Sequence, residues 1–69
     1  MKSDSSVQKL TQRELDIVRL SKEGKLSKEI ADILHISSRT VDNHKSNIFR
    51  KLGLRNVLEL VRYACENDI

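Results

Sequence analysis

Hydrophobic positions along this 69-residue chain recur at helical spacing in four segments that are separated by short polar joins. The first segment begins with a capping box, in which Thr11 is the N-cap and Glu14 follows three residues later. Gly24 supplies a left-handed residue that ends this helix. Its buried stripe is predicted to contain Leu10, which forms a hydrophobic staple with Leu15, together with Leu15, Val18 and, as a further candidate, Ile17.

Three more helices follow from the same reasoning. Ser27 is predicted to cap a short helix over 28–34, whose inward residues are Ile30, Ala31 and Leu34. Ser37 or Ser38 caps a third helix over 38–52, which Gly53 closes. Asn56, with Glu59 at the N3 position, opens a fourth helix that runs to about Asn67.

This pattern predicts an all-α, compact four-helix domain that contains a helix-turn-helix. The absence of proline and the presence of only two glycines favour helices over a sheet sandwich. The helical pattern defines one domain over 9–69. Residues 1–8 are serine-rich and polar, and are expected to be a disordered lead-in or a linker remnant.

The two helices that meet near residue 35 must cross steeply through a short turn, and a close crossing requires a small residue. Ala31 lies at that crossing. Ile30, Leu34, Ile36 and Val41 are spaced to bury together beneath the turn. His35 occupies a turn position that is often glycine, so it must accept a less comfortable backbone or a slightly different turn.

The helix over 38–52 has two opposite faces at about 100° per residue. Its buried arc is expected to contain Val41, His44, Ile48 and Leu52, with Phe49 on the shoulder. The opposite arc contains only hydrogen-bonding and cationic side chains: Arg39, Asn43, Ser46, Asn47 and Arg50.

Charge gathers on the same helix. The chain carries a formal net charge of +3, but the segment 37–55 alone carries +4 and the remaining residues sum to −1. A cationic surplus confined to one helix is typical of a surface that binds a polyanion, because lysine and arginine near phosphates release counterions. Placed opposite the core stripe of a helix-turn-helix, this surplus favours DNA over an ordinary solvated surface.

The chemistry of the exposed face suggests individual roles. Asn43 could bind adenine bidentately, and Arg39 or Arg50 could reach a guanine or a phosphate. Asp42, at the edge of this face, could point to water, orient Arg39, or accept a hydrogen bond from cytosine. The base-facing set is thus Arg39, Asp42, Asn43, Ser46 and Asn47, and the phosphate-facing set is Ser27, Lys28, Thr40, Lys45, Arg50 and Lys51.

The segments LTQRELDIV and SKEIADILHISSRTVDNHKSNIFRKLGL resemble the LuxR-type (NarL/FixJ/GerE-like) helix-turn-helix domain of bacterial transcription regulators. The resemblance covers roughly residues 10–65. It implies that the third helix enters the major groove, with Asp42, Asn43 and Ser46 at the groove, and that the domain binds two half-sites as a dimer. Several relatives carry lysine where this chain has Asp42 and Ser46, so their base preference does not transfer directly.

The resemblance also implies that the fourth helix is the dimer element. Val57, Leu60, Val61 and Ala64 form its predicted core arc, and Leu58 and Cys65 lie on the shoulder. That shoulder is either core margin or, with Val61 and Arg62, a small dimer patch that would associate weakly on its own.

The expected function is sequence-specific binding of double-stranded DNA in transcription regulation, as the output domain of a two-component response regulator. A stand-alone regulator of the same fold and a helical protein-interaction module are the alternatives. RNA polymerase is a further candidate partner.

Other function classes find little support in the sequence. No acid, histidine and nucleophile converge, and no phosphate-binding glycine loop exists, so an enzyme is not expected. Cys65 and two scattered histidines make no zinc pattern, His44 is expected to be a packed, hydrogen-bonded core residue, and no metal or cofactor is predicted. The single cysteine and the lack of a long apolar run favour a cytoplasmic protein without membrane contact.

Overall fold

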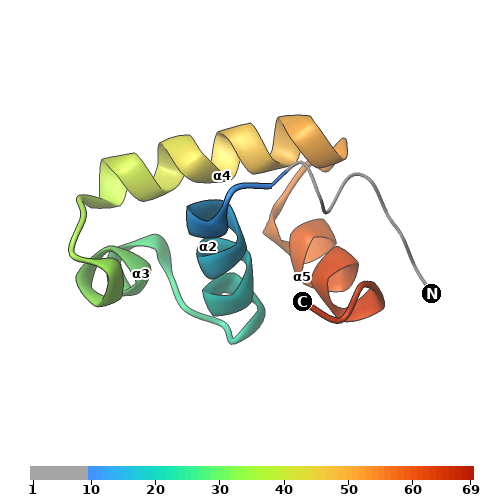
Figure 1. Ribbon diagram of the computed structural model, residues 1–69, viewed down its shortest axis with the longest axis horizontal. Helices are drawn as coiled ribbons and strands as arrows, with labels where there is room; N and C mark the ends of the chain where they lie inside the picture. The colour runs from blue at the N-terminus through green and yellow to red at the C-terminus, as the bar shows by residue number, and fades with distance from the viewer. Residues whose placement is uncertain (1–9) are drawn as a thin grey trace.

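A computed structural model describes residues 10–69 of the chain, and the lead-in predicted for residues 1–8 lies outside them. This part folds into four helices without a strand, as the sequence predicts (Figure 1). The helices are α2 (Gln12–Lys22), α3 (Ser27–Leu34), α4 (Ser38–Leu52) and α5 (Val57–Glu66).

Three of the predicted helix starts are confirmed by their hydrogen bonds. At α2, Thr11 Oγ1 accepts from the Glu14 backbone N–H at 3.1 Å, and Glu14 Oε1 accepts from the Thr11 N–H at 2.9 Å, which completes the capping box. Ser37, rather than Ser38, caps α4 through the Thr40 N–H. Asn56 caps α5 in the same way. Each cap satisfies backbone donors that a helix leaves unpaired in its first turn.

The predicted cap at Ser27 is wrong. Leu26 is the N-cap residue of α3, Ser27 is already the first helical residue, and the Glu29 carboxylate accepts from the Leu26 N–H at 2.8 Å. Glu29 therefore satisfies one of the backbone donors at this helix start, and the Ser27 hydroxyl is free to bond elsewhere.

The turn between α3 and α4 has the strained backbone that the sequence predicts. His35 adopts a left-handed conformation with φ 59° and ψ 44°. The next amide, that of Ile36, donates to the Ala31 carbonyl at 3.0 Å, so the last turn of α3 is closed although the turn lacks glycine. Glycine is found at the corresponding place after α4, where Gly53 has φ 71°.

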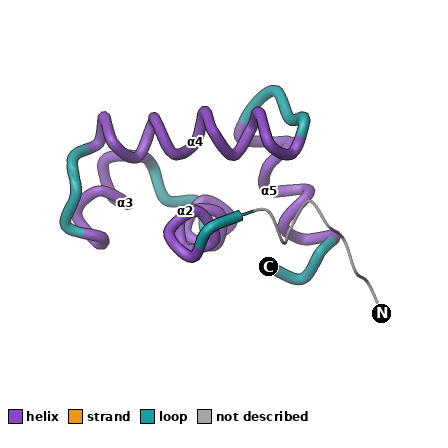
Figure 2. Tube along the Cα trace, turned by 45° about the horizontal axis from the view of Figure 1, so that its top comes forward, coloured by secondary structure: helices purple, strands orange, loops and turns teal. Residues whose placement is uncertain are grey.

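Helix α2 occupies the middle of the domain and contacts the other three helices. In both views α4 runs along one side, with α3 under its first half and α5 near its far end (Figures 1 and 2). The buried core residues come from all four helices and from the residue before the N-cap of α2: Leu10, Ile17, Val18, Ile30, Ala31, Val41, Ile48, Leu60 and Ala64. Because α2 and α3 pack against one side of α4, its opposite side is left to solvent.

Several predicted core positions are less buried than expected, and Leu34, Ile36, Leu52 and Val61 are only partly buried. Val57, placed in the core arc of α5, is 42% exposed because it is the first residue of that helix and lies at its open end. Leu15 is only partly buried, whereas Ile17, the further candidate, is fully buried.

Between residues 10 and 69, no helix combines the length and the apolar character needed to cross a membrane.

Candidate nucleic-acid interface

The outer face of α4 is open to solvent along its length. Its five predicted residues, Arg39, Asn43, Ser46, Asn47 and Arg50, are all exposed, while Val41 and Ile48 on the other side are fully buried. Within the described residues, none of the five side chains makes a hydrogen bond or an ion pair. This surface, which we call the α4 face, therefore presents exposed amide, hydroxyl and guanidinium groups that have no partner among residues 10–69.

On the inner side of α4, His44 and Leu52 are less buried than the sequence predicts. His44 is half-buried rather than a fully buried core residue, and its ring makes no hydrogen bond within residues 10–69. It lies close enough to Glu14 to favour the ionised form of that carboxyl. His44 thus belongs to the margin of the core, next to the carboxylate of α2.

Asp42 and Lys45 project from the edge of the α4 face toward the start of α3. The Ser27 hydroxyl donates to Asp42 Oδ1 at 2.7 Å and accepts from Lys45 Nζ at 3.0 Å. Asp42 is exposed, and Ser27 and Lys45 are half-buried. We call these three side chains the Ser27 network. It explains how an acid can lie beside a cationic surface. Asp42 bonds Ser27, a partner that was not among the three alternatives from the sequence, which were water, Arg39 and cytosine.

The remaining predicted phosphate contacts lie around this network. Thr40 is half-buried, and its hydroxyl shares a hydrogen bond of 2.8 Å with the Ser37 hydroxyl. Lys28 is exposed in the first turn of α3. Both are on the side of the domain where α3 and the start of α4 meet.

Lys51 is held in a different environment at the far end of α4. Its ammonium forms a 2.7 Å ion pair with Glu14, whose side chain is 5% exposed, against 33% for Lys51. Burial alone would raise the pKa of Glu14, but the hydrogen bonds from Lys51 and the Thr11 amide outweigh it, so the pKa lies below its ordinary value of 4.5. The cation predicted to reach a phosphate is thus tied to the core.

This ion pair was not predicted, although the sequence contains a sign of it. Glu14 falls on the same helical face as Ile17, Val18 and Ser21, all of which are buried. A carboxylate on a core-facing stripe needs a cationic partner, because an isolated buried charge is strongly unfavourable. The capping role of Glu14 alone does not reveal its need for a cationic partner.

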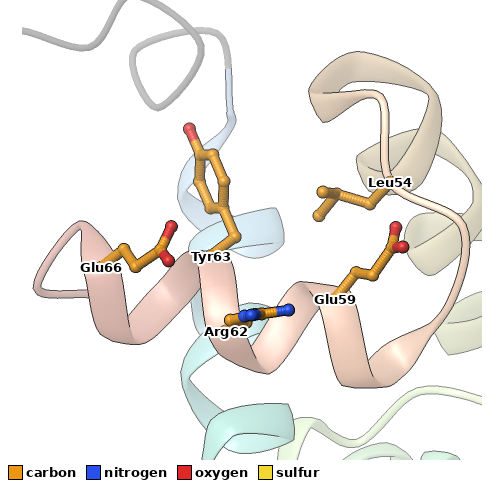
Figure 3. Close-up of a pocket in the computed structure, with 5 residues that line it drawn as sticks. All are labelled: Leu54, Glu59, Arg62, Tyr63 and Glu66. Carbon is orange, nitrogen blue, oxygen red and sulfur yellow. The ribbon is translucent and has the colours of Figure 1, made fainter.

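The predicted dimer residues on α5 divide into two groups. Leu58 is 75% exposed and Cys65 is exposed, whereas Val61 is half-buried. Arg62 lines a shallow groove with Leu54, Glu59, Tyr63 and Glu66 (Figure 3). In the described residues the most exposed large hydrophobic side chain is Leu58, on the helix that the family resemblance implies is the dimer element.

The sequence of the chain matches that of a known bacterial family. The model for bacterial regulatory proteins of the luxR family matches residues 8–64, which is most of the chain. The chain belongs to this family. Among its relatives in the family, Fimbriae Z protein from Escherichia coli K12 is 48% identical over 62 residues, which cover 90% of this chain and 30% of that protein.

Two other relatives show a similar level of identity. Oxygen regulatory protein NreC from Staphylococcus aureus JH9 is 45% identical over 60 residues, covering 87% of the luxR-family chain and 28% of NreC. The uncharacterized response regulatory protein YgeK from Escherichia coli K12 is 43% identical over 60 residues, covering 87% and 41%. The chain spans less than half the length of each of these relatives.

Proposed function

We propose that this luxR-family domain binds double-stranded DNA sequence-specifically in transcription regulation, with α4 in the major groove. The observation that carries the proposal is the α4 face: five exposed donor and acceptor side chains on a 15-residue helix whose opposite side is packed on the core. A helix of this kind fits the major groove, where each base pair presents its own pattern of donors and acceptors.

The proposal assigns roles by position along α4. Asn43 and Asn47 supply amides that can read base edges, with Ser46 between them, and Arg39 and Arg50 reach a guanine or the backbone. Lys28, Lys45 and Thr40 are assigned to the phosphates flanking the groove. Lys51 is assigned to the stability of the domain, because its ammonium is shared with the buried Glu14.

We further propose that two copies associate through α5 and that the domain is the output unit of a response regulator. The exposed Leu58 supports the first point, and a relative named as a response regulatory protein supports the second. One leucine with a half-buried valine is a small contact, so the isolated domain is expected to dimerise weakly. A stand-alone regulator of the same fold is the alternative to the second point.

The test begins with selection of a binding site from random duplexes, followed by fluorescence anisotropy with the selected site and a scrambled duplex. Asn43→Ala is expected to weaken binding to the selected site by roughly 1–3 kcal/mol and to change binding to the scrambled duplex little. Gln12→Ala, which removes an exposed amide from α2, is the control and should leave both affinities unchanged. Equal losses on both duplexes would exclude Asn43 from base readout.

Complete absence of duplex binding at low salt would overturn the proposed function and leave the protein-interaction alternative. Dimerisation is tested separately by sedimentation equilibrium with and without the selected duplex. Leu58→Glu should abolish cooperative binding to a paired site while binding to a single half-site is retained.

A further inference from the structure

The two hydrogen bonds of the Ser27 network have fixed donor and acceptor roles, because of the chemistry of a hydroxyl group. A serine hydroxyl carries one proton and can accept with its lone pairs. In this structure the proton is donated to Asp42, and a lone pair accepts from Lys45. While Asp42 holds that proton, Ser27 has no donor left for another anion.

The same groups would form a phosphate contact if Asp42 were absent. A hydroxyl donor and a lysine ammonium from adjacent helices, next to the first-turn amides of α3, are donors that a DNA phosphate uses. In the free domain, the carboxylate of Asp42 occupies the hydroxyl donor of this set in place of a phosphate. The three side chains are exposed or half-buried, so the network is open to solvent and can be exchanged for an external anion at small cost.

Resting on the proposed function, we propose that Asp42 is an intramolecular competitor for the DNA backbone. Its carboxylate holds Ser27 and screens Lys45 in the free domain, and a phosphate must displace it from Ser27 to be bound there. Asp42 then lowers the affinity for every duplex, whatever its sequence, and reduces the number of counterions released on binding. It acts against the phosphate contact through Ser27 and Lys45, and it reads no base.

The proposal is tested by measuring the affinity of the 69-residue chain for a random-sequence duplex over a range of salt concentrations. Asp42→Ala is expected to tighten binding about fivefold at low salt, and to steepen the slope of log K against log salt by about 0.9, the value for one added phosphate contact. Asp32→Ala is the matched control, since it removes an equal charge from an exposed position of α3, and it should change affinity less than about twofold.

A double-mutant cycle with Ser27→Ala separates the network from simple charge repulsion. If Asp42 acts by holding the Ser27 proton, the gain from Asp42→Ala should fall by half or more when Ser27 is absent. An equal gain in both backgrounds would mean that Asp42 only repels DNA through space, and would overturn the proposal. Circular dichroism and urea unfolding should show all three variants folded, because the network is outside the core.

The remaining outcomes are also decisive. An effect of Asp42→Ala that is limited to the selected site would show that Asp42 reads a base, and weaker binding to all duplexes would show that it supports the interface; either overturns the proposal. If the wild-type chain and every variant fail to bind any duplex at low salt, the proposed function fails and the inference fails with it. Duplex binding by the wild type that is indifferent to Asp42 removes the inference alone.

Discussion

Along α4, two lysines meet a carboxylate in different ways. Near its start, Lys45 and Asp42 meet through the Ser27 hydroxyl in a partly exposed network. At its far end, Lys51 pairs directly with Glu14, which is almost completely buried. Solvent screens the first arrangement and leaves it free to exchange partners, whereas burial makes the second costly to disrupt. Burial, rather than charge, separates the residues available for binding from those that hold the fold.

The largest effect should come from removing the cation of the buried pair. Lys51→Met leaves the Glu14 carboxylate without its cationic partner. We expect the free energy of unfolding to fall by about 2–3 kcal/mol. This loss is smaller than that for a fully buried pair, because Lys51 is partly exposed. Urea unfolding measures this loss. Lys45→Met is the control at the other end of α4 and should cost less than about 1 kcal/mol. Equal losses would show that the two ends do not differ as argued.

A smaller effect should appear on acidification. Because the folded-state pKa of Glu14 lies below its ordinary value of 4.5, the folded domain binds this proton less readily than the unfolded chain does. The stabilisation is present above that ordinary value and is lost as the pH falls through the folded-state pKa. Urea midpoints measured from about pH 6 to about pH 3 should follow this trend.

Two variants sharpen the acid experiment. Glu14→Gln removes the titrating group, so the loss of stability on acidification should be smaller than in the wild type. Lys51→Met removes the main influence that lowers the pKa of Glu14, while burial still raises it. The loss of stability of this variant on acidification should therefore also be smaller than in the wild type. An unchanged pH dependence in both variants would mean that other carboxyl groups govern acid unfolding.

The sequence predicts the helices well because contacts between residues close in the sequence determine where each helix begins and ends. Thr11 with Glu14, and Asn56 with Glu59, are pairs three residues apart, and periodicity alone places Asn43 and Asn47 opposite Val41. It predicts less well what depends on distant partners. Ser27 meets Asp42 and Lys45 across 15 and 18 positions, and Lys51 meets Glu14 across 37. No local rule assigns such pairs, so the sequence predicts Ser27 as a cap and a phosphate contact, and Lys51 as a phosphate contact.

Ser21 and Ser27 lie in opposite surroundings. Ser21 is 2% exposed in α2, and within the described residues its hydroxyl has no hydrogen-bond partner. Because an unpaired buried hydroxyl is unfavourable and alanine has the higher helix propensity, Ser21→Ala should raise the free energy of unfolding by about 0.5–1 kcal/mol. A clear loss of stability in urea unfolding would indicate that the hydroxyl bonds an ordered water in solution.

The smallest stability effect is expected at Ser27. Its hydroxyl makes two hydrogen bonds, yet both are in the solvent-accessible network, so water can replace them in Ser27→Ala, and the free energy of unfolding should change by less than about 0.5 kcal/mol. Thr11→Ala, which removes a capping hydroxyl, should cost about 1 kcal/mol and serves as the reference for a serine or threonine with a structural role. A loss at Ser27 as large as that at Thr11 would show that the Ser27 network holds α3 against α4, and the contrast between the two ends of α4 would then be one of degree.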